Sequence, residues 1–420
     1  RGGGTALFSR YTLRLLTAQQ FERTATLTCA LEKLRREGRI LGSEKISIGL
    51  WIGGGKTSSP NTLSDAVRLH DEMLQQEDPV NHFMLLNCPW CGHSIIPKQR
   101  SENRSDYGIH VDSVSMKFNC TQSGCDFSND LPVSVVDEVM YQSPPTILLG
   151  TIDKFARLPW EGRSRAFFGL HGNVLPPDLV IQDELHLISG PLGTIAAIYE
   201  AGNDVLVDSA ESSPKVVAAT ATIRGASDQC RRLYGREVRV FPSPGINADD
   251  SYFMRELEGK SDSDQNPKSA SRMYVGIMGQ AHTPVTATVR SMAAMLDAGG
   301  RVTPNDDFWT LVAYHNSRRE LGKTQTLARD DIPARIQQIA ASYDHTDEEE
   351  VPAEVRGCHE VKGLSGDTPR YEIPIVLENL EKPRESGQAI DVLACTSMIS
   401  VGVDVGRLNQ MIIVGQPKTT

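Results

Sequence analysis

The sequence is poor in cysteine and has no long apolar run. Eight cysteines among 420 residues are too few for a disulfide-stabilised scaffold, and four of them stand in two close pairs. No stretch reaches the roughly eighteen uninterrupted apolar residues that a membrane-spanning helix needs, and no basic-then-apolar leader opens the chain. These absences predict a soluble, cytoplasmic protein without membrane contact.

An excess of positive charge is also missing. Lys and Arg number 43 against 53 Asp and Glu, so the formal net charge is −10. This balance excludes a surface that is basic all over, but an acidic protein can still hold nucleic acid in a local positive groove. The hydrophobic share of 39% and the charged share of 23% are typical of globular proteins and exclude a disordered, collagenous or coiled-coil chain.

The length of the chain allows two or three domains of ordinary size. The chain begins at Arg1 rather than Met, and Thr420 follows directly on an apolar run. We therefore expect a fragment of a longer protein.

Short apolar runs alternate with longer helical patterns through most of the chain, which predicts an α/β fold with helices on both faces of a parallel sheet. In the first half we expect strands at 5–9, 46–52, 146–150, 179–183 and 215–220, and helices at 17–37, 63–75, 193–208 and 226–234. In the second half we expect strands at 310–314, 391–396 and 410–414, and helices at 285–297, 332–342 and 373–380.

Two composition changes predict the domain limits. Residues 245–272 are polar and rich in turn-forming residues, which is typical of a linker between compact units. Residues 83–130 hold four cysteines and few apolar runs, so we expect a small inserted module there. The predicted domains are 1–244, which contains this insertion, and 273–420.

One apolar run ends abruptly in charged residues. Residues 179–182 are followed by Asp183 and Glu184, and His186 comes two positions later. At the carboxyl end of a parallel strand, such an Asp can hold the Mg²⁺ of a bound nucleotide, while the Glu orients and deprotonates the attacking water. The alternative is an acidic N-cap at the end of a structural strand.

A second apolar run, at 215–219, ends in Thr220 and Thr222. These hydroxyl groups could bond to the acidic motif and report the state of the nucleotide. The alternative is that Thr222 caps the helix that follows.

Together, the two motifs resemble motifs II and III of superfamily 2 helicases, the DExH-box group. Four further segments are similar to motifs of this family and stand in the family's order: motif Ia at 10–20, Ib at 150–155, IV at 311–317 and V at 394–404. The resemblance covers nearly the whole chain and implies two RecA-like domains, with ATP and Mg²⁺ bound in the cleft between them.

The resemblance also implies roles for individual residues. In the family, motifs Ia, Ib, IV and V contact the nucleic-acid backbone, which carries no base information. By this likeness the nucleic-acid-binding residues are Arg10, Thr12, Arg14, Thr151, Lys154, His315, Asn316 and Thr396, and the nucleotide-facing residues are Gly402 and Asp404. Structural alternatives remain: flanking of a strand-to-helix turn by Arg10 and Arg14, an N-cap at Thr151 and a strand bulge at Gly402.

Two elements of the family pattern are missing. A phosphate loop needs Gly six positions before its Lys, and Leu50 stands at that place before Lys56. We therefore interpret Gly53–Thr57 as a glycine turn and expect motif I before Arg1 and motif VI beyond Thr420. Because phosphate loops and arginine fingers supply most of the catalysis, the fragment alone should not hydrolyse ATP efficiently.

Four cysteines have the spacing of a zinc site. A C-x2-C pair and a C-x4-C pair are separated by twenty-eight residues, and they comprise Cys88, Cys91, Cys120 and Cys125. Four thiolates complete the tetrahedral shell of Zn²⁺, so the predicted zinc-ribbon-like site is structural. The alternative is four buried thiols of a reduced protein, and His82 or His93 could replace one ligand. The inserted module could extend the nucleic-acid groove or bind a partner subunit.

The resemblance implies ATP-dependent translocation on nucleic acid, or unwinding of it. Two sequence segments, 11–20 and 401–417, together with the cysteine insertion, look most like the helicase subunit of the bacterial DISARM phage-defence system. This likeness favours DNA over RNA and predicts partner subunits of a defence complex. The alternative function is a catalytically inactive, zinc-stabilised scaffold that binds nucleic acid or protein and keeps the helicase fold.

Overall fold

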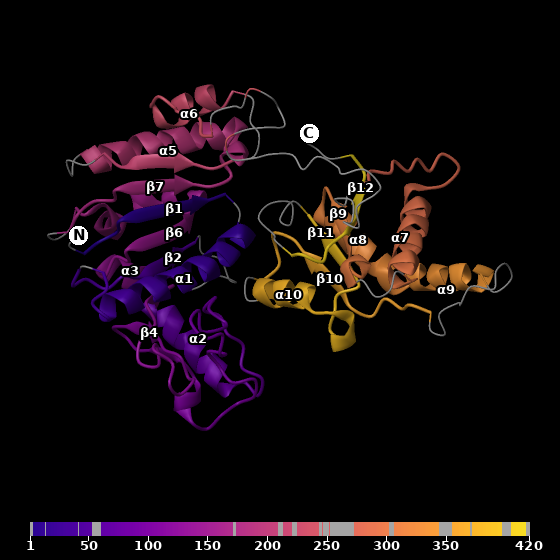
Figure 1. Cartoon of the computed structure of the whole chain (residues 1–420), viewed down its shortest axis with the longest axis horizontal. Coiled ribbons are helices and arrows are strands. Elements are labelled where there is room, and N and C mark those ends of the chain that lie inside the picture. The colour runs from indigo at the N-terminus through magenta and orange to yellow at the C-terminus, as the bar shows by residue number, and fades with distance from the viewer. Residues whose placement is uncertain are drawn as a thin grey trace.

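The computed structural model describes the following residues: 3–12, 14–40, 42–52, 60–170, 174–208, 213–220, 225–242, 246, 252, 273–301, 306–343, 355–369, 372–396 and 405–416, without the side chains of 14–19 and 159. These residues form two units, each built around its own parallel sheet (Figure 1). The first unit has a six-stranded sheet and the second a four-stranded sheet.

The sheet of the first unit has the strand order β5-β2-β6-β1-β7-β8 and is parallel throughout. Its strands β2 and β6 are buried along their whole length, as expected of continuous apolar runs in a sheet covered on both faces. In chain order the strands are β1 (Leu7–Tyr11), β2 (Ile48–Trp51), β5 (Val133–Ser134), β6 (Ile147–Thr151), β7 (Leu179–Gln182) and β8 (Lys215–Ala218).

Helices cover both faces of this sheet. One face packs Leu149 and Tyr11 against Phe21 and Ala25 of the long helix that follows β1. The other face packs Phe8 and Val180 against Val207 of the helix that follows β7. The helices of the first unit are α1 (Arg14–Arg36), α2 (Leu63–Gln75), α3 (Asp137–Gln142), α4 (Ile152–Phe155), α5 (Gly190–Asp208) and α6 (Ala226–Tyr234).

The predicted insertion forms a small module beside α2 (Figure 1). Its strands β3 (Ile109–Val111) and β4 (Met116–Phe118) make an antiparallel hairpin that is separate from the main sheet. Phe118 and Phe127 are buried and join the core that α1 forms with the sheet. The module therefore shares a hydrophobic core with the first unit.

The second unit has the strand order β10-β11-β9-β12, also parallel. Its strands are β9 (Leu311–His315), β10 (Val361–Leu364), β11 (Val392–Cys395) and β12 (Gln410–Val414), and its helices are α7 (Pro284–Arg301), α8 (Arg318–Arg329), α9 (Asp331–Tyr343) and α10 (Glu372–Glu381). Apolar residues of α7 and α9 pack on one face of β9 and β11, and those of α10 pack on the other face.

The predicted α/β fold with two parallel sheets is confirmed. Helices α2 and α6 and strand β12 have the predicted limits, and most other elements differ by a few residues. In the first unit the prediction missed the short elements β3, β4, β5, α3 and α4. In the second unit it missed α8 and β10, because the first is largely polar and Val361–Leu364 contains Lys362 and Gly363. The expected strand at 215–220 ends at Ala218, so Thr220 lies beyond it. The domain limits stay a prediction.

No helix among the described ranges is both long enough and apolar enough to cross a membrane.

Substitution of Gly150 tests the packing at the centre of the first sheet. A Cβ atom at Gly150 would lie 2.6 Å from the backbone oxygen of Trp51. Backbone cannot give way cheaply, so we expect Gly150→Ala to lower the free energy of unfolding by about 1–3 kcal/mol. Gly202 lies in α5 with open space around it, and Gly202→Ala should raise stability by up to ~1 kcal/mol. Denaturant titration of both variants measures this, and equal stability of the two would contradict the packing.

Candidate functional site

The acidic motif lies where β7 ends, in the interior of the first sheet. Strand β7 lies between β1 and β8, and its last residue, Gln182, pairs with Arg10. The Asp183 N–H donates to the Arg10 carbonyl at 3.0 Å, and the Gln182 side chain donates to the same carbonyl at 3.3 Å. The backbone of β1 therefore fixes where the first carboxylate of the motif leaves the sheet.

Glu184 turns the chain at this point. It has a left-handed backbone conformation with φ of 51°, which is uncommon for a residue other than glycine. Its N–H donates to the Asp183 carboxylate at 2.9 Å, and the next side chain, Leu185, is buried in the core. The Leu185 N–H donates to the Ala219 carbonyl at 3.0 Å, so the turn is tied to the chain that leaves β8. Such strained residues cluster at functional sites.

His186 connects the acidic motif with the threonine motif. Its Nδ1 atom lies 3.2 Å from Oγ1 of Thr220 and 3.3 Å from a carboxylate oxygen of Glu184. All three side chains are reachable by solvent. The structure thus brings Glu184, His186 and Thr220 together, whereas Thr222 lies outside the described residues.

The predicted nucleic-acid contact Arg10 is buried. Only 1% of its surface is accessible, and its guanidinium forms an ion pair with Glu200 of α5. The guanidinium also lies 5.4 Å from the ring centre of Phe155. In this structure Arg10 therefore joins the centre of the sheet to the helix that follows the acidic motif, and it does not present its charge to a groove.

Lys154 is buried in a similar way. Its ammonium group pairs with Asp137 and lies 3.3 Å from the Ile52 carbonyl and 3.4 Å from the side-chain oxygen of Asn61. Burial raises the pKa of Asp137, and the Lys154 charge opposes that shift. Lys154 thus ties together three chain segments near the end of β2.

The other nucleic-acid-binding residues predicted in the first unit are Thr12, Arg14 and Thr151. The hydroxyl oxygens of Thr12 and Thr151 are buried and have no hydrogen-bond partner among the described residues. Thr151 precedes α4, but its side chain makes no cap hydrogen bond. The side chain of Arg14 lies outside the described part of the chain.

In the second unit, the predicted contacts follow the ends of β9 and β11. His315 is 1% exposed, and burial lowers its pKa, which favours the neutral imidazole. The Asn316 side chain donates to the Gln416 carbonyl at 2.7 Å, next to the end of β12. The Thr396 N–H donates to the Leu364 carbonyl at 3.1 Å. The nucleotide-facing candidates Gly402 and Asp404 lie outside the described ranges.

No sequence pattern indicates the acidic partners of the buried Arg10 and Lys154. Glu200 lies 190 residues from Arg10, and Asp137 lies 17 residues from Lys154. Neither acid stands in a recognisable motif. The chain brings these charges together only when the helices pack on the sheet, so no local pattern marks the two acids. The burial of Glu200 and Asp137 is the feature that marks them in the structure.

Acidic side chains also gather where the two units meet. Glu22 of α1 faces Glu378 and Glu381 of α10 beside a cavity of about 190 Å³. Burial and the two neighbouring carboxylates raise the pKa of Glu22. In Figure 1, α1 begins on the side of the first unit that faces the second unit. Since α1 directly follows β1, the carboxyl edge of the first sheet lies on this side.

The four predicted metal ligands form one cluster. The sulfur atoms of Cys88, Cys91, Cys120 and Cys125 all lie within 4.8 Å of one another. The Cys91–Cys120 separation is 3.4 Å and the Cys88–Cys125 separation is 4.0 Å. Four sulfurs at 2.3 Å from a tetrahedral zinc ion lie about 3.8 Å apart, so the cluster has the size that Zn²⁺ requires. Neither His82 nor His93 belongs to the cluster.

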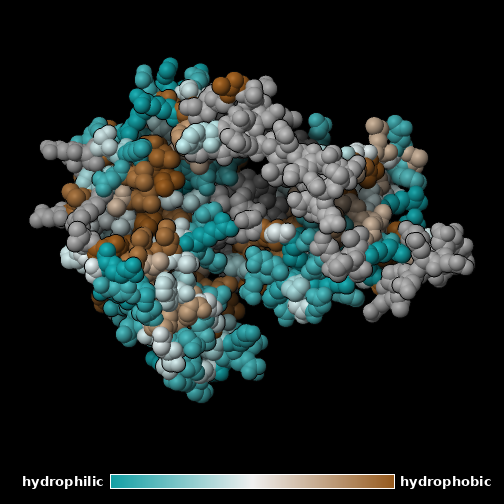
Figure 2. Space-filling view, viewed as in Figure 1, coloured by the Kyte–Doolittle hydropathy of each residue, from teal (hydrophilic) through white to brown (hydrophobic). Residues whose placement is uncertain are grey.

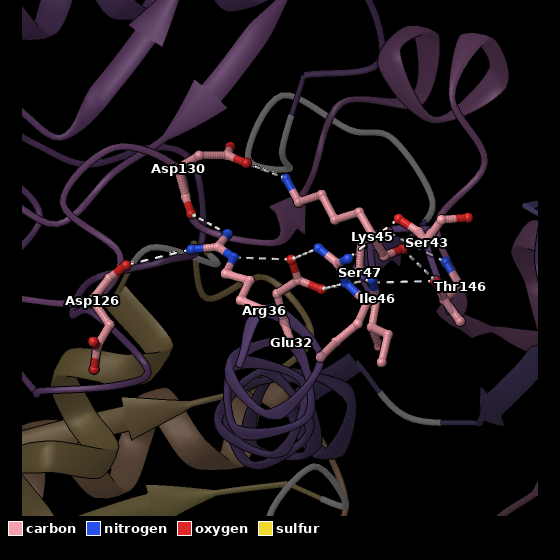
Figure 3. Close-up of polar contacts among 10 residues, drawn as sticks. Glu32, Arg36, Ser43, Lys45, Ile46, Ser47, Asp126, Asp130 and Thr146 are labelled. Carbon is pink, nitrogen blue, oxygen red and sulfur yellow. Dashed lines mark hydrogen bonds and ion pairs between the residues drawn. The ribbon is translucent and has the colours of Figure 1, made fainter. Parts of the chain in front are cut away.

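The cysteine module is docked on the last turns of α1 (Figure 3). Arg36 donates to the backbone carbonyls of Asp126 and Asp130, both at 3.4 Å, and its guanidinium stacks on Phe127. Lys33 pairs with the Asp126 carboxylate at 2.7 Å, and Trp90 donates to that carboxylate at 3.0 Å. The segment directly after Cys125 is therefore held by side chains of one helix.

Glu32 organises this contact from inside α1. Its carboxylate accepts hydrogen bonds from Arg35, Arg36 and the Ile46 N–H. Burial opposes ionisation, but the hydrogen bonds from Arg35, the Ile46 N–H and Arg36 outweigh it and lower the pKa of Glu32 to about 2. Glu32 is therefore ionised at every physiological pH and holds Arg36 in place against the module (Figure 3).

The fold is that of a solved helicase. The helicase Lhr of Mycobacterium smegmatis, solved bound to ssDNA and AMP-PNP, matches this chain with a TM-score of 0.51 and 13% sequence identity. The match covers 98% of this chain and 36% of that chain. No family model matches the sequence.

A particular relative is similar along the whole sequence. The DISARM protein DrmA of Bacillus paralicheniformis is 34% identical over 473 aligned residues, which include 100% of this chain. The resemblance to a DISARM helicase predicted from the sequence is thereby confirmed. The chain spans 40% of the length of this relative.

Removal of one charge from the buried Arg10–Glu200 ion pair should destabilise the protein. Glu200→Gln leaves the Arg10 charge buried without its counter-ion, so we expect a loss of about 3–5 kcal/mol in the free energy of unfolding. The double variant Arg10→Met, Glu200→Leu removes both charges and should recover most of this loss. Denaturant titration measures both, and a cost below ~1 kcal/mol for Glu200→Gln would contradict a structural role for the pair.

The cysteine cluster should bind one zinc ion per chain. Cys88→Ser with Cys91→Ser removes two of the four thiolates, so we expect bound zinc to disappear and the module to lose its fold. Elemental analysis gives the zinc content, and thermal melting gives the stability. Cys230→Ser is the control, since Cys230 lies in α6 and outside the cluster. A metal-free wild-type protein that melts at an unchanged temperature would argue against the site.

Proposed function

We propose that this chain is part of an ATP-dependent motor that moves along nucleic acid or unwinds it. One observation carries the proposal: Asp183, Glu184, His186 and Thr220 gather at the carboxyl edge of a parallel sheet in a chain with the helicase fold. Open parallel sheets bind ligands outside the carboxyl ends of their strands. This arrangement supports the roles in nucleotide hydrolysis and coupling that we propose for these residues.

The roles follow from the chemistry of the side chains. Asp183 would hold Mg²⁺, which neutralises charge on the phosphates of ATP. The Glu184 carboxylate would orient a water molecule and accept its proton. His186 contacts both Glu184 and Thr220, so a movement of the acidic motif shifts the chain that follows β8. We propose this contact as the coupling step.

We propose that nucleic acid binds across the carboxyl edges of the two sheets. Asn316 and Thr396 are half-buried at the edge of the second sheet, and their side chains are available for such contacts. Arg10, Lys154 and His315 are buried, and we propose that they act by holding strand ends and helices in position. The DISARM relative supports a role in phage defence with partner subunits. We propose DNA as the substrate and the cytoplasm as the location.

The motor proposal needs groups that residues 1–420 do not supply. We propose that a phosphate loop and the arginines of motif VI stand elsewhere in the parent polypeptide, and that 1–244 and 273–420 are the two domains that close on ATP. Closure and reopening of the cleft would move the nucleic-acid-binding residues of the two domains relative to each other. The relative is long enough for such additions, because this chain covers 40% of it.

A second candidate function is an inactive scaffold that keeps the helicase fold and is stabilised by zinc. The position of Leu50 favours it: this residue is buried in β2, where a phosphate loop would have its first glycine before Lys56. A complete polypeptide that has no phosphate loop would favour the scaffold over the motor.

Glu184→Gln in the complete polypeptide tests the proposed motor. We expect nucleic-acid-stimulated ATPase activity to fall by ~100-fold or more, because the amide cannot accept a proton from water. ATP binding should persist, since Asp183 is intact. The control is Glu237→Gln, an exposed acidic residue after α6. ATPase rates with and without single-stranded DNA measure the effect, and unchanged turnover in Glu184→Gln would reject the assigned role.

A further inference from the structure

The main contact between the two units involves α1 and α10. Among the helices and strands of the described ranges, no other pair from different units shares as much contact. Figure 1 shows α10 on the side of the second unit that faces α1. Ile373, Val376 and Leu380 of α10 are buried in the core of the second unit, so α10 moves only together with its sheet. Any element that holds α10 therefore holds the whole second unit.

The four-cysteine module takes part in this contact. The cavity of about 190 Å³ between the units is lined by Leu86 and Asn87, the two residues directly before Cys88. Pro374 and Leu377 of α10 line the same cavity. These four side chains carry no charge. The module thus reaches the second unit through uncharged side chains next to one of its four cysteines.

Backbone hydrogen bonds fix the segment before Cys88. The Ile95 N–H donates to the Leu86 carbonyl at 2.9 Å, and the Cys88 N–H donates to the His93 carbonyl at 2.7 Å. The two bonds close a short hairpin whose turn carries the first cysteine pair. Zinc bound by this pair would stiffen the hairpin, because both thiolates would share one ion. The position of residues 86–87 therefore depends on the fold of the cysteine module.

Three carboxylates at the same contact act against it. Glu22 of α1 faces Glu378 and Glu381 of α10, and like charges at close range repel one another. Burial, and then the two neighbouring carboxylates, raise the pKa of Glu22. Lys382 lies 3.7 Å from Glu378 and offsets part of the repulsion. Figure 2 shows a mainly hydrophilic surface where Figure 1 shows α10. We call Glu22, Glu378 and Glu381 the carboxylate trio.

We propose that the four-cysteine module is a latch between the two units: residues 86–87 hold α10 against α1, and repulsion within the carboxylate trio keeps this hold weak enough to release. A neutral side chain in the trio would strengthen the hold, and loss of the module's fold would abolish it. The latch gives the inserted module a role in the relative placement of the two units. The contact can be measured without ATP, so its test is independent of the proposed motor.

Photocrosslinking tests the contact in the complete polypeptide without nucleotide. With the photoreactive residue p-benzoylphenylalanine in place of Asn87, an exposed position at the cavity, we expect crosslinks to residues 374–381 of the same chain, identified by peptide mass spectrometry. The same photoreactive residue in place of Val114 is the control, since Val114 is 70% exposed and lines a different cavity. No crosslink from position 87 to α10, or crosslinks that join two chains, would overturn the proposal.

Loss of two cysteines tests whether the module holds the contact. In the chain with the photoreactive residue at position 87, Cys88→Ser with Cys91→Ser should lower the crosslink yield by ~5-fold or more, because the hairpin loses its metal. Cys230→Ser is the control, since Cys230 lies outside the cluster. Circular dichroism checks that the two sheets remain folded. An unchanged yield in the double variant would overturn the proposal.

Removal of charge tests the carboxylate trio. In the same photoreactive chain, Glu378→Gln with Glu381→Gln should raise the crosslink yield by ~2-fold or more, because the repulsion of Glu22 is lost. Glu22→Gln should act in the same direction from α1. The control is Glu385→Gln, which removes an exposed acid of the second unit that lines a different cavity. An unchanged yield in the trio variants, or an equal rise in the control, would overturn the proposal.

Discussion

The pairing of β7 with β1 is the constraint on which the candidate site depends. The Arg10 carbonyl accepts the Asp183 N–H, so the first carboxylate leaves the sheet at a point fixed by a neighbouring strand. The left-handed turn at Glu184 then directs its carboxylate toward His186, and His186 contacts Thr220 beyond β8. Three adjacent strands thus determine the geometry of the four side chains of the proposed nucleotide site.

Buried ion pairs extend this constraint into the helices. Arg10 fixes α5 through Glu200, and Lys154 fixes the start of α3 through Asp137. Burying each ion pair costs desolvation free energy, and the attraction between the charges repays this cost only when the geometry is good. We therefore explain the two pairs by the positioning of helices and not by a gain in stability. Both act on chain segments close to the carboxyl edge. The same pairing explains why Arg10 and Lys154, which lie in segments similar to helicase motifs, do not present their charges to a nucleic-acid backbone in this structure.

The cysteine module acts on the first unit through α1. Glu32 holds Arg36, and Arg36 holds the carbonyls directly after Cys125 (Figure 3). Because α1 also follows β1, the zinc-type cluster and the acidic edge are connected by one helix and one strand. We therefore expect a change in the cluster to act on the acidic edge through α1 and β1.

The sequence by itself determined the local features. The apolar runs, the adjacent carboxylates, the cysteine spacing and the order of family-like motifs predicted the fold class, the resemblance to a DISARM helicase and the four-cysteine cluster. Each of these signals is a short pattern, or the order of short patterns along the chain, and both can be read without knowing which elements pack together. Tertiary structure alone decided that Arg10 and Lys154 are buried, that Glu200 and Asp137 are their partners, and that β8 lies at an exposed edge. The physical reason is that burial and charge pairing are set by which elements pack together, and segments up to 190 residues apart carry no local trace of that contact.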